Sequence, residues 1–154
     1  MSGLRLRPAR AGEAAALSAL ALRSKGHWGY DAAFLELCRP ELTLAEEDLG
    51  RLTTVVAERD GRVVGFAGLA LDGSRAELDL LFVEPEAIGT GAGAALLRAA
   101  REAARSRGAD ELVVVSDPNA EGFYRAHGGE RVGERPGVGS ERVLPVLRLP
   151  IAGP

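Results

Sequence analysis

The chain has 154 residues, of which 46% are hydrophobic and 27% are charged, and its net charge is −3 at pH 7. These values are ordinary for a globular protein with one core, and we expect residues 1–154 to form a single domain. The mildly acidic balance argues against a nucleic-acid partner, which usually meets a basic face. No apolar run approaches the ~20 residues of a membrane span. The lone cysteine, Cys38, excludes an internal disulfide, so we expect a cytoplasmic protein without a membrane partner.

The first third of the chain predicts one strand and two helices. Residues 4–7 alternate between leucine and arginine, which is typical of a short strand. The Ala- and Leu-rich segment 11–25 predicts a helix. Asp31 is a suitable N-cap for a second helix over residues 32–39, which Pro40 is expected to end.

The middle of the chain predicts three antiparallel strands. Two strands over residues 52–58 and 62–71 flank Asp60-Gly61, and an Asp-Gly pair is a strong hairpin signal. A second Asp-Gly pair at residues 72–73 leads into a strand over residues 77–83. Consecutive strands joined by such short turns form a meander.

The next segment predicts a helix, a central strand and a short helix. The helix over residues 94–107 has an apolar face, and Gly108 is placed to end it. Residues 112–115 are all apolar, as expected of a strand buried on both faces. A short helix is expected over residues 120–127.

The end of the chain predicts a loop and one more strand. Residues 134–141 are rich in glycine and proline and are expected to form a loop. In the last strand, residues 144–149, Pro145 favours an edge position or the strand start. The predicted order is β-α-α-β-β-β-α-β-α-β, with a single β-α-β crossover.

The most informative segment joins the strand ending at Val83 to the helix beginning at Ala94. Gly89, Gly91 and Gly93 stand at alternate positions there. Glycines allow a tight turn and leave backbone N–H groups uncovered. These donors lie at a helix N-terminus, whose dipole favours anions. The segment therefore predicts a pyrophosphate site.

Two other interpretations of these glycines are open. The first is a turn without chemical importance. The second is a dinucleotide-binding fold, because Gly89, Gly91 and Ala94 fit the loose G-x-G-x-x-G/A pattern. Against it, residues 84–88 separate the strand from the first glycine. The loop also follows a meander rather than the first strand of a β-α-β series.

Two motifs in this order resemble the GNAT N-acetyltransferase superfamily. Residues 77–97 are similar to motif A, with an apolar strand, Val-x-Pro at 83–85 and a glycine loop before a helix. Residues 112–127 are similar to motif B, in which an apolar strand leads to an asparagine and a helix carrying Phe-Tyr. One departure is Ile88, since the family usually has Arg or Gln just before the glycines.

The resemblance implies a GNAT fold of the α/β (α+β) class. Its mixed, mostly antiparallel sheet would have about six to seven strands and about four helices. A V-shaped splay is expected between the strand before the glycine loop and the strand at 112–115. The resemblance further implies an acetyl-CoA-dependent N-acetyltransferase that modifies a primary amine of a small molecule or a protein. The alternative, which Ile88 favours, is a non-catalytic acyl-CoA-binding regulatory domain. Dimers are frequent in the family, so a homodimer is one possible assembly.

For the cofactor, the resemblance assigns backbone groups to the pantetheine arm and to the pyrophosphate. The assigned residues are Leu81, Phe82 and Val83 for the arm, and Ile88, Gly89, Thr90, Gly91, Ala92, Gly93 and Ala94 for the pyrophosphate. Asn119 matches a residue that contacts the arm in many members. It is an equally good N-cap for the helix that starts at residue 120.

For the chemistry, Tyr124 matches the general acid that protonates the coenzyme A sulfur. A phenol with a pKa of about 10 is protonated at neutral pH. The alternative is that Tyr124 only anchors a short helix in the core. Glu77 lies where some members carry a basic glutamate, and Asp79 shares its strand face. An ordered water is the alternative base.

For the acceptor, the superfamily uses its two N-terminal helices with the loop between them, and the loop before the last strand. Trp28 and Tyr30 lie in such a glycine-flanked loop, and the resemblance makes them substrate-binding residues together with the segment 134–141. Aromatic rings make good contact surfaces. Trp28 could equally fill the core between the helices. No His/Cys cluster has metal-ligand spacing, so no metal is expected.

Overall fold

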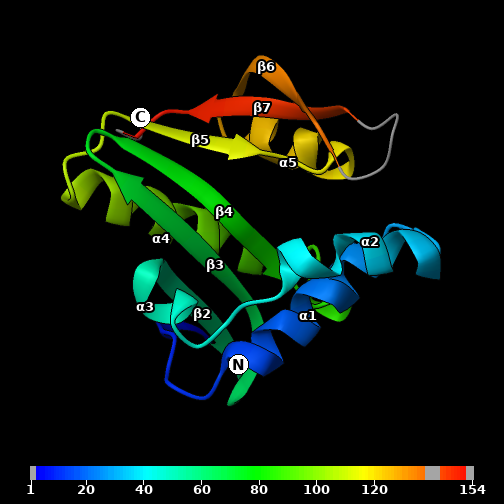
Figure 1. Ribbon diagram of the computed structural model, residues 1–154. Helices are drawn as coiled ribbons and strands as arrows, with labels where there is room; N and C mark the ends of the chain where they lie inside the picture. The colour runs from blue at the N-terminus through cyan, green and yellow to red at the C-terminus, as the bar shows by residue number, and fades with distance from the viewer. Residues whose placement is uncertain (1–2, 138–142, 152–154) are drawn as a thin grey trace.

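The computed structural model describes residues 3–137 and 143–151 of the chain. Within these ranges, seven strands form one sheet in the order β1-β2-β3-β4-β5-β7-β6, with helices on both faces (Figure 1). All neighbouring strands are antiparallel except β4 and β5, which are parallel. The predicted class, a mixed and mostly antiparallel sheet flanked by helices, is confirmed.

The elements follow the predicted order, with one strand and one short helix added. The strands are β1 (Leu4–Pro8), β2 (Thr53–Arg59), β3 (Arg62–Asp72), β4 (Arg75–Val83), β5 (Glu111–Val115), β6 (Glu130–Pro136) and β7 (Val143–Leu149). The helices are α1 (Ala14–Gly26), α2 (Ala32–Leu42), α3 (Asp48–Arg51), α4 (Ala92–Ser106) and α5 (Glu121–Ala126), with 3-10 turns η1 (Pro85–Ala87) and η2 (Pro118–Ala120). The additions are α3 and β6.

The predicted meander of β2, β3 and β4 forms because its turns carry suitable residues. Asp60 and Gly61, between β2 and β3, have φ values of 57° and 76°. Positive φ at both central residues is the geometry of a type I′ turn, which matches the twist of the two strands. Gly73, between β3 and β4, has a φ of 61°. Both turns thus sit where the Asp-Gly pairs predicted them.

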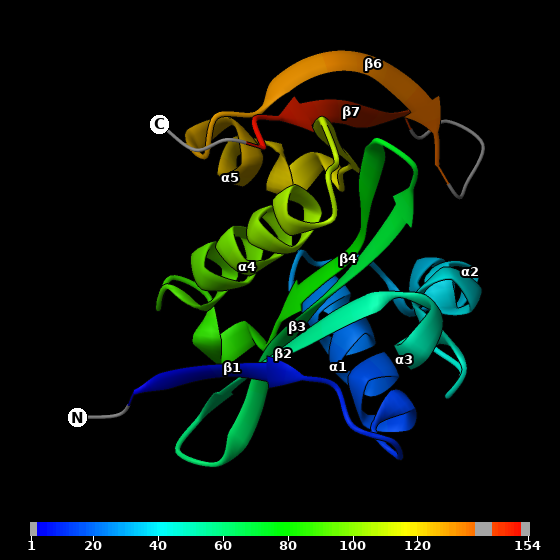
Figure 2. The same cartoon turned by 90° about the vertical axis from the view of Figure 1, so that its left-hand side faces the viewer.

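Two hydrophobic clusters cover the two faces of the sheet. On one face α4 contributes Leu96, Ala100 and Ala104, which recur at the spacing of one helix side. On the other face α1 contributes Leu17 and Leu20. Figure 2 shows α4 and α1 on opposite sides of the central strands. Among the described residues, no helix is both long and apolar enough to cross a membrane.

The prediction that Pro40 ends the second helix is wrong. Helix α2 includes Pro40 and continues to Leu42. Proline removes a backbone N–H from the helix, but here it lies in the last turn. Cys38 and Leu42 are buried at 3% and 7% exposure, and this packing holds the turn. The N-cap prediction is confirmed, since the Asp31 carboxylate accepts from the Phe34 N–H at 2.8 Å.

The predicted loop over residues 134–141 is wrong for residues 134–136, which belong to β6. Every side chain of β6 is exposed, so the strand has no buried face. Its sequence therefore lacks the alternation of apolar and polar residues from which a strand is predicted. Its pairing with β7 holds it in place. The rest of the predicted loop from residue 138 onward lies outside the described residues.

The edge position suggested for the last strand is also wrong, because β7 lies between β5 and β6. Its pairing with β5 ends at Val115 opposite Val146, so Pro145 lies beyond the end of β5. The Pro145 carbonyl accepts from the Ser116 N–H at 2.9 Å. Proline therefore interrupts no ladder bond on the β5 side.

The predicted V-shaped splay between β4 and β5 is confirmed. The two strands pair only from Arg75 opposite Glu111 to Leu78 opposite Val114. Beyond this point β4 continues to Val83, and no described strand pairs with it on the β5 side. The divergence opens the sheet at the place where the predicted site residues lie.

Candidate active site

A cavity of about 460 Å³ lies where β4 and β5 diverge. Its walls come from the end of α1, from β4, from the loop before α4, from the turn after β5, and from α5. Most predicted site residues line it: Trp28, Leu81, Phe82, Val83, Ile88, Gly89, Gly91, Gly93, Ala94 and Tyr124. The predicted residues outside its wall are Tyr30, Glu77, Thr90, Ala92 and Asn119.

Strand β4 presents a backbone edge to the cavity. The Glu84 N–H donates to the Val64 carbonyl at 2.8 Å. Because backbone groups alternate in direction along a strand, Phe82 also faces β3, whereas Leu81 and Val83 face the gap. Of the three residues predicted for the pantetheine arm, two therefore offer backbone groups on the cavity side. Such an edge can pair with an extended chain as an added strand would.

A β-bulge in β4 separates the two carboxylates considered as bases. Gly68 of β3 pairs with Leu80 and the next residue, Leu69, pairs with Leu78, so Asp79 is the extra residue. Asp79 lines the cavity, whereas Glu77 does not. The sequence assigned both to one strand face because the bulge was not foreseen.

The surroundings of the two carboxylates also differ. Glu77 Oε1 lies 3.6 Å from Arg135 Nη1 on β6, in a partly exposed ion pair. Asp79 as a residue is exposed, but desolvation of its carboxyl at the cavity wall, and secondarily the charge of Glu77, raises the pKa of that carboxyl. A carboxylate with a raised pKa is a better proton acceptor. Among the residues that the structure describes, no group of three or more His, Cys, Asp or Glu is arranged to hold a metal.

The glycine loop turns the chain into α4 with left-handed backbone conformations. Gly89 and Gly91 have φ values of 82° and 93°. The Gly91 carbonyl accepts the first helical hydrogen bond, from Ala95, at 3.0 Å. Within the described part of the chain, the N–H groups of residues 92–94 have no backbone acceptor, as expected at a helix start. These free donors fit a diphosphate.

Two predicted donors of this loop are used inside it. The Ile88 N–H donates to Pro85 at 3.3 Å, and the Thr90 N–H donates to Ala87 at 3.2 Å. Arg59 was not predicted as a site residue, but its Nη1 donates to Thr90 Oγ1 at 3.0 Å. Arg59 ends β2, 31 residues before Thr90, so only the folded sheet brings its charge to the loop.

Tyr124 belongs both to the core and to the cavity wall. It is 5% exposed, packs in the cluster beneath α4, and lines the cavity. The neighbouring Phe123 ring packs edge-on against it at 5.1 Å between centroids. Burial raises the pKa of the Tyr124 phenol above its ordinary value. The phenol is therefore protonated throughout the neutral range.

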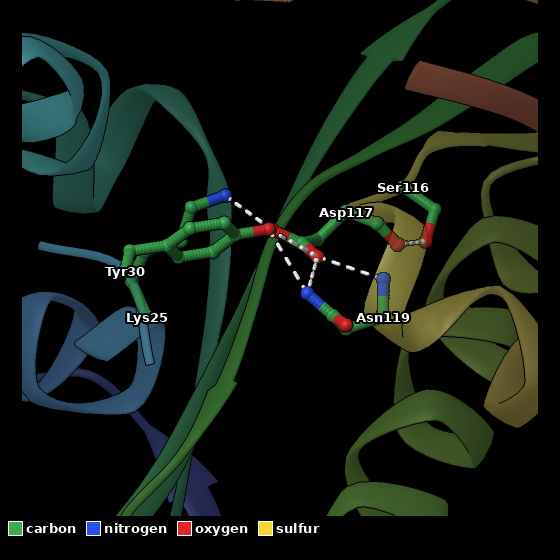
Figure 3. A network of polar contacts seen from close by, with 5 residues as sticks. All are labelled: Lys25, Tyr30, Ser116, Asp117 and Asn119. Atoms are coloured by element: carbon green, nitrogen blue, oxygen red, sulfur yellow. Dashed lines mark hydrogen bonds and ion pairs between the residues drawn. The ribbon is translucent and has the colours of Figure 1, made fainter. Parts of the chain in front are cut away.

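A hydrogen-bond network links the end of α1 to the turn after β5 (Figure 3). Asp117 Oδ2 accepts from Lys25 Nζ at 2.5 Å and from the Tyr30 hydroxyl at 3.0 Å. The Asn119 side-chain amide donates to Asp117 Oδ1 and to the Tyr30 oxygen, both at 2.9 Å. Lys25 Nζ also lies 5.4 Å from the centre of the Tyr30 ring, within cation–π range.

This network corrects the proposed capping role of Asn119. The N-cap of η2 is Asp117, whose Oδ1 accepts from the Asn119 N–H at 2.8 Å. Burial opposes the charge of Asp117, but donation from Lys25 and from the Asn119 N–H holds its pKa below the usual value. Lys25 belongs to the segment 25–30 that was predicted to wall the acceptor site, but its pairing with Asp117 was not predicted, because 92 positions separate the two residues.

The interpretation of Trp28 as a core residue is wrong. Its side chain is 42% exposed and lines the cavity. The ring packs edge-on against His27 at 5.0 Å between centroids. Tyr30 packs instead on Phe34 at 4.6 Å, and its hydroxyl belongs to the network above. Trp28 thus presents an aromatic surface at the cavity mouth.

Comparison with known families decides between the interpretations of the glycine loop. The model of the acetyltransferase (GNAT) domain matches residues 13–139. The chain belongs to the GNAT family. The dinucleotide-binding interpretation is therefore wrong. The GNAT match includes both motifs and most of the cavity wall.

Similar proteins agree with this family. A mycothiol acetyltransferase of Clavibacter sepedonicus is 42% identical over 55 residues, which is 36% of this chain and 18% of that protein. The chain thus covers about a fifth of the length of the curated relatives it matches.

Solved structures share the fold of this GNAT domain. The PaiA N-acetyltransferase of Thermoplasma acidophilum, in complex with coenzyme A, has a TM-score of 0.80 at 18% identity, over 96% of this chain and 99% of that one. A GCN5-related N-acetyltransferase of Rhodopseudomonas palustris has a TM-score of 0.79 at 24% identity, over 97% of each chain.

Proposed function

We propose that this GNAT domain is an acetyl-CoA-dependent N-acetyltransferase that modifies a primary amine of a small molecule or a protein. The observation that carries the proposal is the cavity at the β4–β5 splay. Its wall combines an unpaired strand edge, a glycine-capped helix start and a buried tyrosine. These are the three features that a thioester-dependent acyl transfer needs: grip on the arm, grip on the diphosphate and a proton donor.

For coenzyme A, we propose that the N–H groups of residues 92–94 bind the diphosphate and that Leu81 and Val83 pair with the pantetheine arm. Helix N-termini favour phosphate, and the free donors at the start of α4 support this assignment. Arg59, bonded to Thr90, brings a guanidinium to the loop where the family's usual Arg or Gln is replaced by Ile88. Asn119, beside the wall, stays a predicted contact of the arm.

For the transfer, we propose that Asp79 takes a proton from the incoming ammonium and that Tyr124 donates one to the departing sulfur. A bond forms between the amine nitrogen and the acetyl carbonyl carbon as the carbon–sulfur bond breaks. Burial raises the pKa of the coenzyme A thiol as it raises the pKa of the Tyr124 phenol. The buried phenol can therefore still donate its proton to the buried sulfur. Glu77 and an ordered water are the remaining candidates for the base.

For the acceptor, the charged residues on the cavity wall favour a cationic amine. Asp79, Asp117 and Glu41 line the cavity, and Lys25 is the cation among them. Trp28 adds an exposed ring, whose face attracts an ammonium group. We propose an amine that is protonated before it binds and is deprotonated inside the cavity.

The test is a thiol-release assay with acetyl-CoA against a panel of cationic amines, together with calorimetry of coenzyme A binding. We expect binding of coenzyme A and acetylation of at least one amine. Binding without thiol release from any amine would favour the regulatory acyl-CoA-binding alternative. A folded protein with no affinity for coenzyme A would contradict the proposal as a whole.

We further propose that the protein works in the cytoplasm, either as a monomer or as a homodimer. Cys38 is the only cysteine of the chain and is buried, which suits a reducing compartment. Light scattering of the purified chain distinguishes the two assemblies, and cell fractionation tests the location.

A further inference from the structure

The cavity wall contains the only lysine of the chain. The sequence has 19 lysine and arginine residues, and Lys25 is the single lysine among them. Its side chain is 13% exposed, and the residue lines the same cavity as Leu81 and Tyr124. The chain therefore carries a primary amine of its own inside the cavity where an amine is proposed to be acetylated.

We propose that Lys25 is a self-acetylation site; this inference rests on the proposed function. The new bond joins Lys25 Nζ to the acetyl carbonyl carbon of acetyl-CoA, and the carbon–sulfur bond breaks. The ammonium gives up two protons in all. One is taken by Asp79 and passes to solvent, and the other replaces the proton that Tyr124 gives to the sulfur. The products are an amide at Lys25, free coenzyme A and one released proton.

Asp117 keeps three hydrogen-bond donors when Lys25 leaves it. When the Lys25 ammonium moves away, Asp117 still accepts from the Tyr30 hydroxyl at 3.0 Å and from Asn119 through both its N–H and its side-chain amide. Removing one donor from a carboxylate that keeps three costs much less than leaving it unpaired. The four-carbon stem of lysine supplies the reach.

The reaction needs Lys25 away from Asp117, because an ion-paired ammonium has no lone pair for attack. Asp79 lines the same cavity, so its carboxylate is placed to accept the proton. Acetylation then removes the charge of Lys25. The link between the end of α1 and the turn after β5 would lose the Lys25 ion pair and keep the hydrogen bonds of Tyr30 with Asp117 and Asn119.

The experiment is mass spectrometry of the purified full chain incubated with acetyl-CoA and no other amine. The α-amino group of the same chain is an internal reference. A solvated α-amine is more often neutral near pH 8 than a solvated lysine amine, by a factor of about 10². Uncatalysed acetylation in solution therefore favours the α-amine. We expect the opposite order in the folded protein, with Lys25 acetylated faster.

Three controls assign the modification to the cavity, and a fourth, dilution, shows whether it occurs within one chain. Unfolding in urea should abolish the preference for Lys25, and Tyr124→Phe should slow its acetylation at least about tenfold. Lys25→Arg keeps a cation opposite Asp117 but has no acetylatable amine, so one acetyl group should disappear from the intact mass. A rate per molecule that does not change on dilution indicates reaction within one chain.

The possible results separate the two proposals. Acetylation of a panel amine with Lys25 unmodified would overturn self-acetylation and leave the proposed function intact. Equal labelling of Lys25 in folded and unfolded chains would overturn it as well, since the reaction would then be uncatalysed. No acetylation of Lys25 or of any panel amine, despite a folded chain, would contradict the proposed function itself.

Discussion

The two ends of the cavity are built in different ways. At the end proposed for the cofactor, the chemistry comes from backbone N–H and carbonyl groups of residues 81–94, a continuous stretch. At the end proposed for the acceptor, it comes from side chains of three separate segments of the sequence, which supply Lys25 and Trp28, Asp79, and Asp117. Backbone recognition depends on conformation, so it constrains the sequence to glycines. Recognition by side chains depends on residues that the fold brings together, so the types of these residues can vary.

This difference explains why the family is recognisable while the acceptor is not. A coenzyme A diphosphate is the same in every member, so one loop conformation serves all of them. An acceptor differs between enzymes and must be met by charges and rings that can change without altering the fold. Substitutions at residues of the cavity wall test this division.

Replacing Tyr124 with phenylalanine should give the largest effect. The ring stays in the core, but the proton donor to the sulfur is lost, so kcat should fall by ~10- to 10⁴-fold. Steady-state kinetics with acetyl-CoA and a verified amine measures this. Thermal unfolding of the variant serves as the control and should change little, because the phenylalanine ring keeps the packing. Unchanged turnover would remove Tyr124 from the mechanism.

Replacing Asp79 with asparagine should come next, with kcat/KM lower by about 10². A general base acts in its ionised form, so kcat/KM of the parent protein should fall as the pH drops through the Asp79 pKa. Because that pKa is raised, the acidic limb should lie above the usual range of an aspartate. In Asp79→Asn this limb should disappear.

The matched variant is Glu77→Gln, on the same strand but outside the cavity wall. Its pH–rate profile should keep the acidic limb, moved to slightly lower pH because the charge of Glu77 contributes to the raised pKa of Asp79. The reverse result, with the limb lost in Glu77→Gln and kept in Asp79→Asn, would return the role of base to Glu77.

Much of the fold could be predicted because local chemistry determined it. The Asp-Gly turns, the Asp31 cap and the apolar run of β5 each act over a few residues. Predictions failed where packing or pairing overrode local preference. Burial of Leu42 carries α2 past Pro40, and pairing with β7 holds the fully exposed β6.

The site divides along the same line. The glycine loop could be located from sequence, because Gly89 and Gly91 adopt positive φ that other residues rarely adopt. The bulge at Asp79 could not, since it arises from a register slip between β3 and β4. Nor could the pair of Lys25 and Asp117, which forms only when α1 docks beside the end of β5.

At the cofactor end, Gly91→Ala should raise the KM for acetyl-CoA about tenfold. A side chain at a φ of 93° costs about 1–2 kcal/mol, and relaxation of this strain would misalign the donors at the start of α4. Gly108→Ala is the matched control, because Gly108 follows the other end of α4 with a φ of 79°. It should lose similar stability without a change in KM. Equal KM values in both variants would mean that the loop geometry does not bind the cofactor.

The smallest effect is expected from Arg59→Gln, which removes a positive charge from beside the glycine loop. The guanidinium donates to Thr90 Oγ1 and carbonyl oxygen at 3.0 and 3.4 Å, and a partly exposed charge contributes little. The KM for acetyl-CoA should rise about two- to fivefold, and its dependence on salt should weaken. Arg62→Gln is the control, since Arg62 begins β3 beyond the same turn with an exposed side chain. If both variants raise KM equally, Arg59 acts only through the overall charge and does not compensate for Ile88.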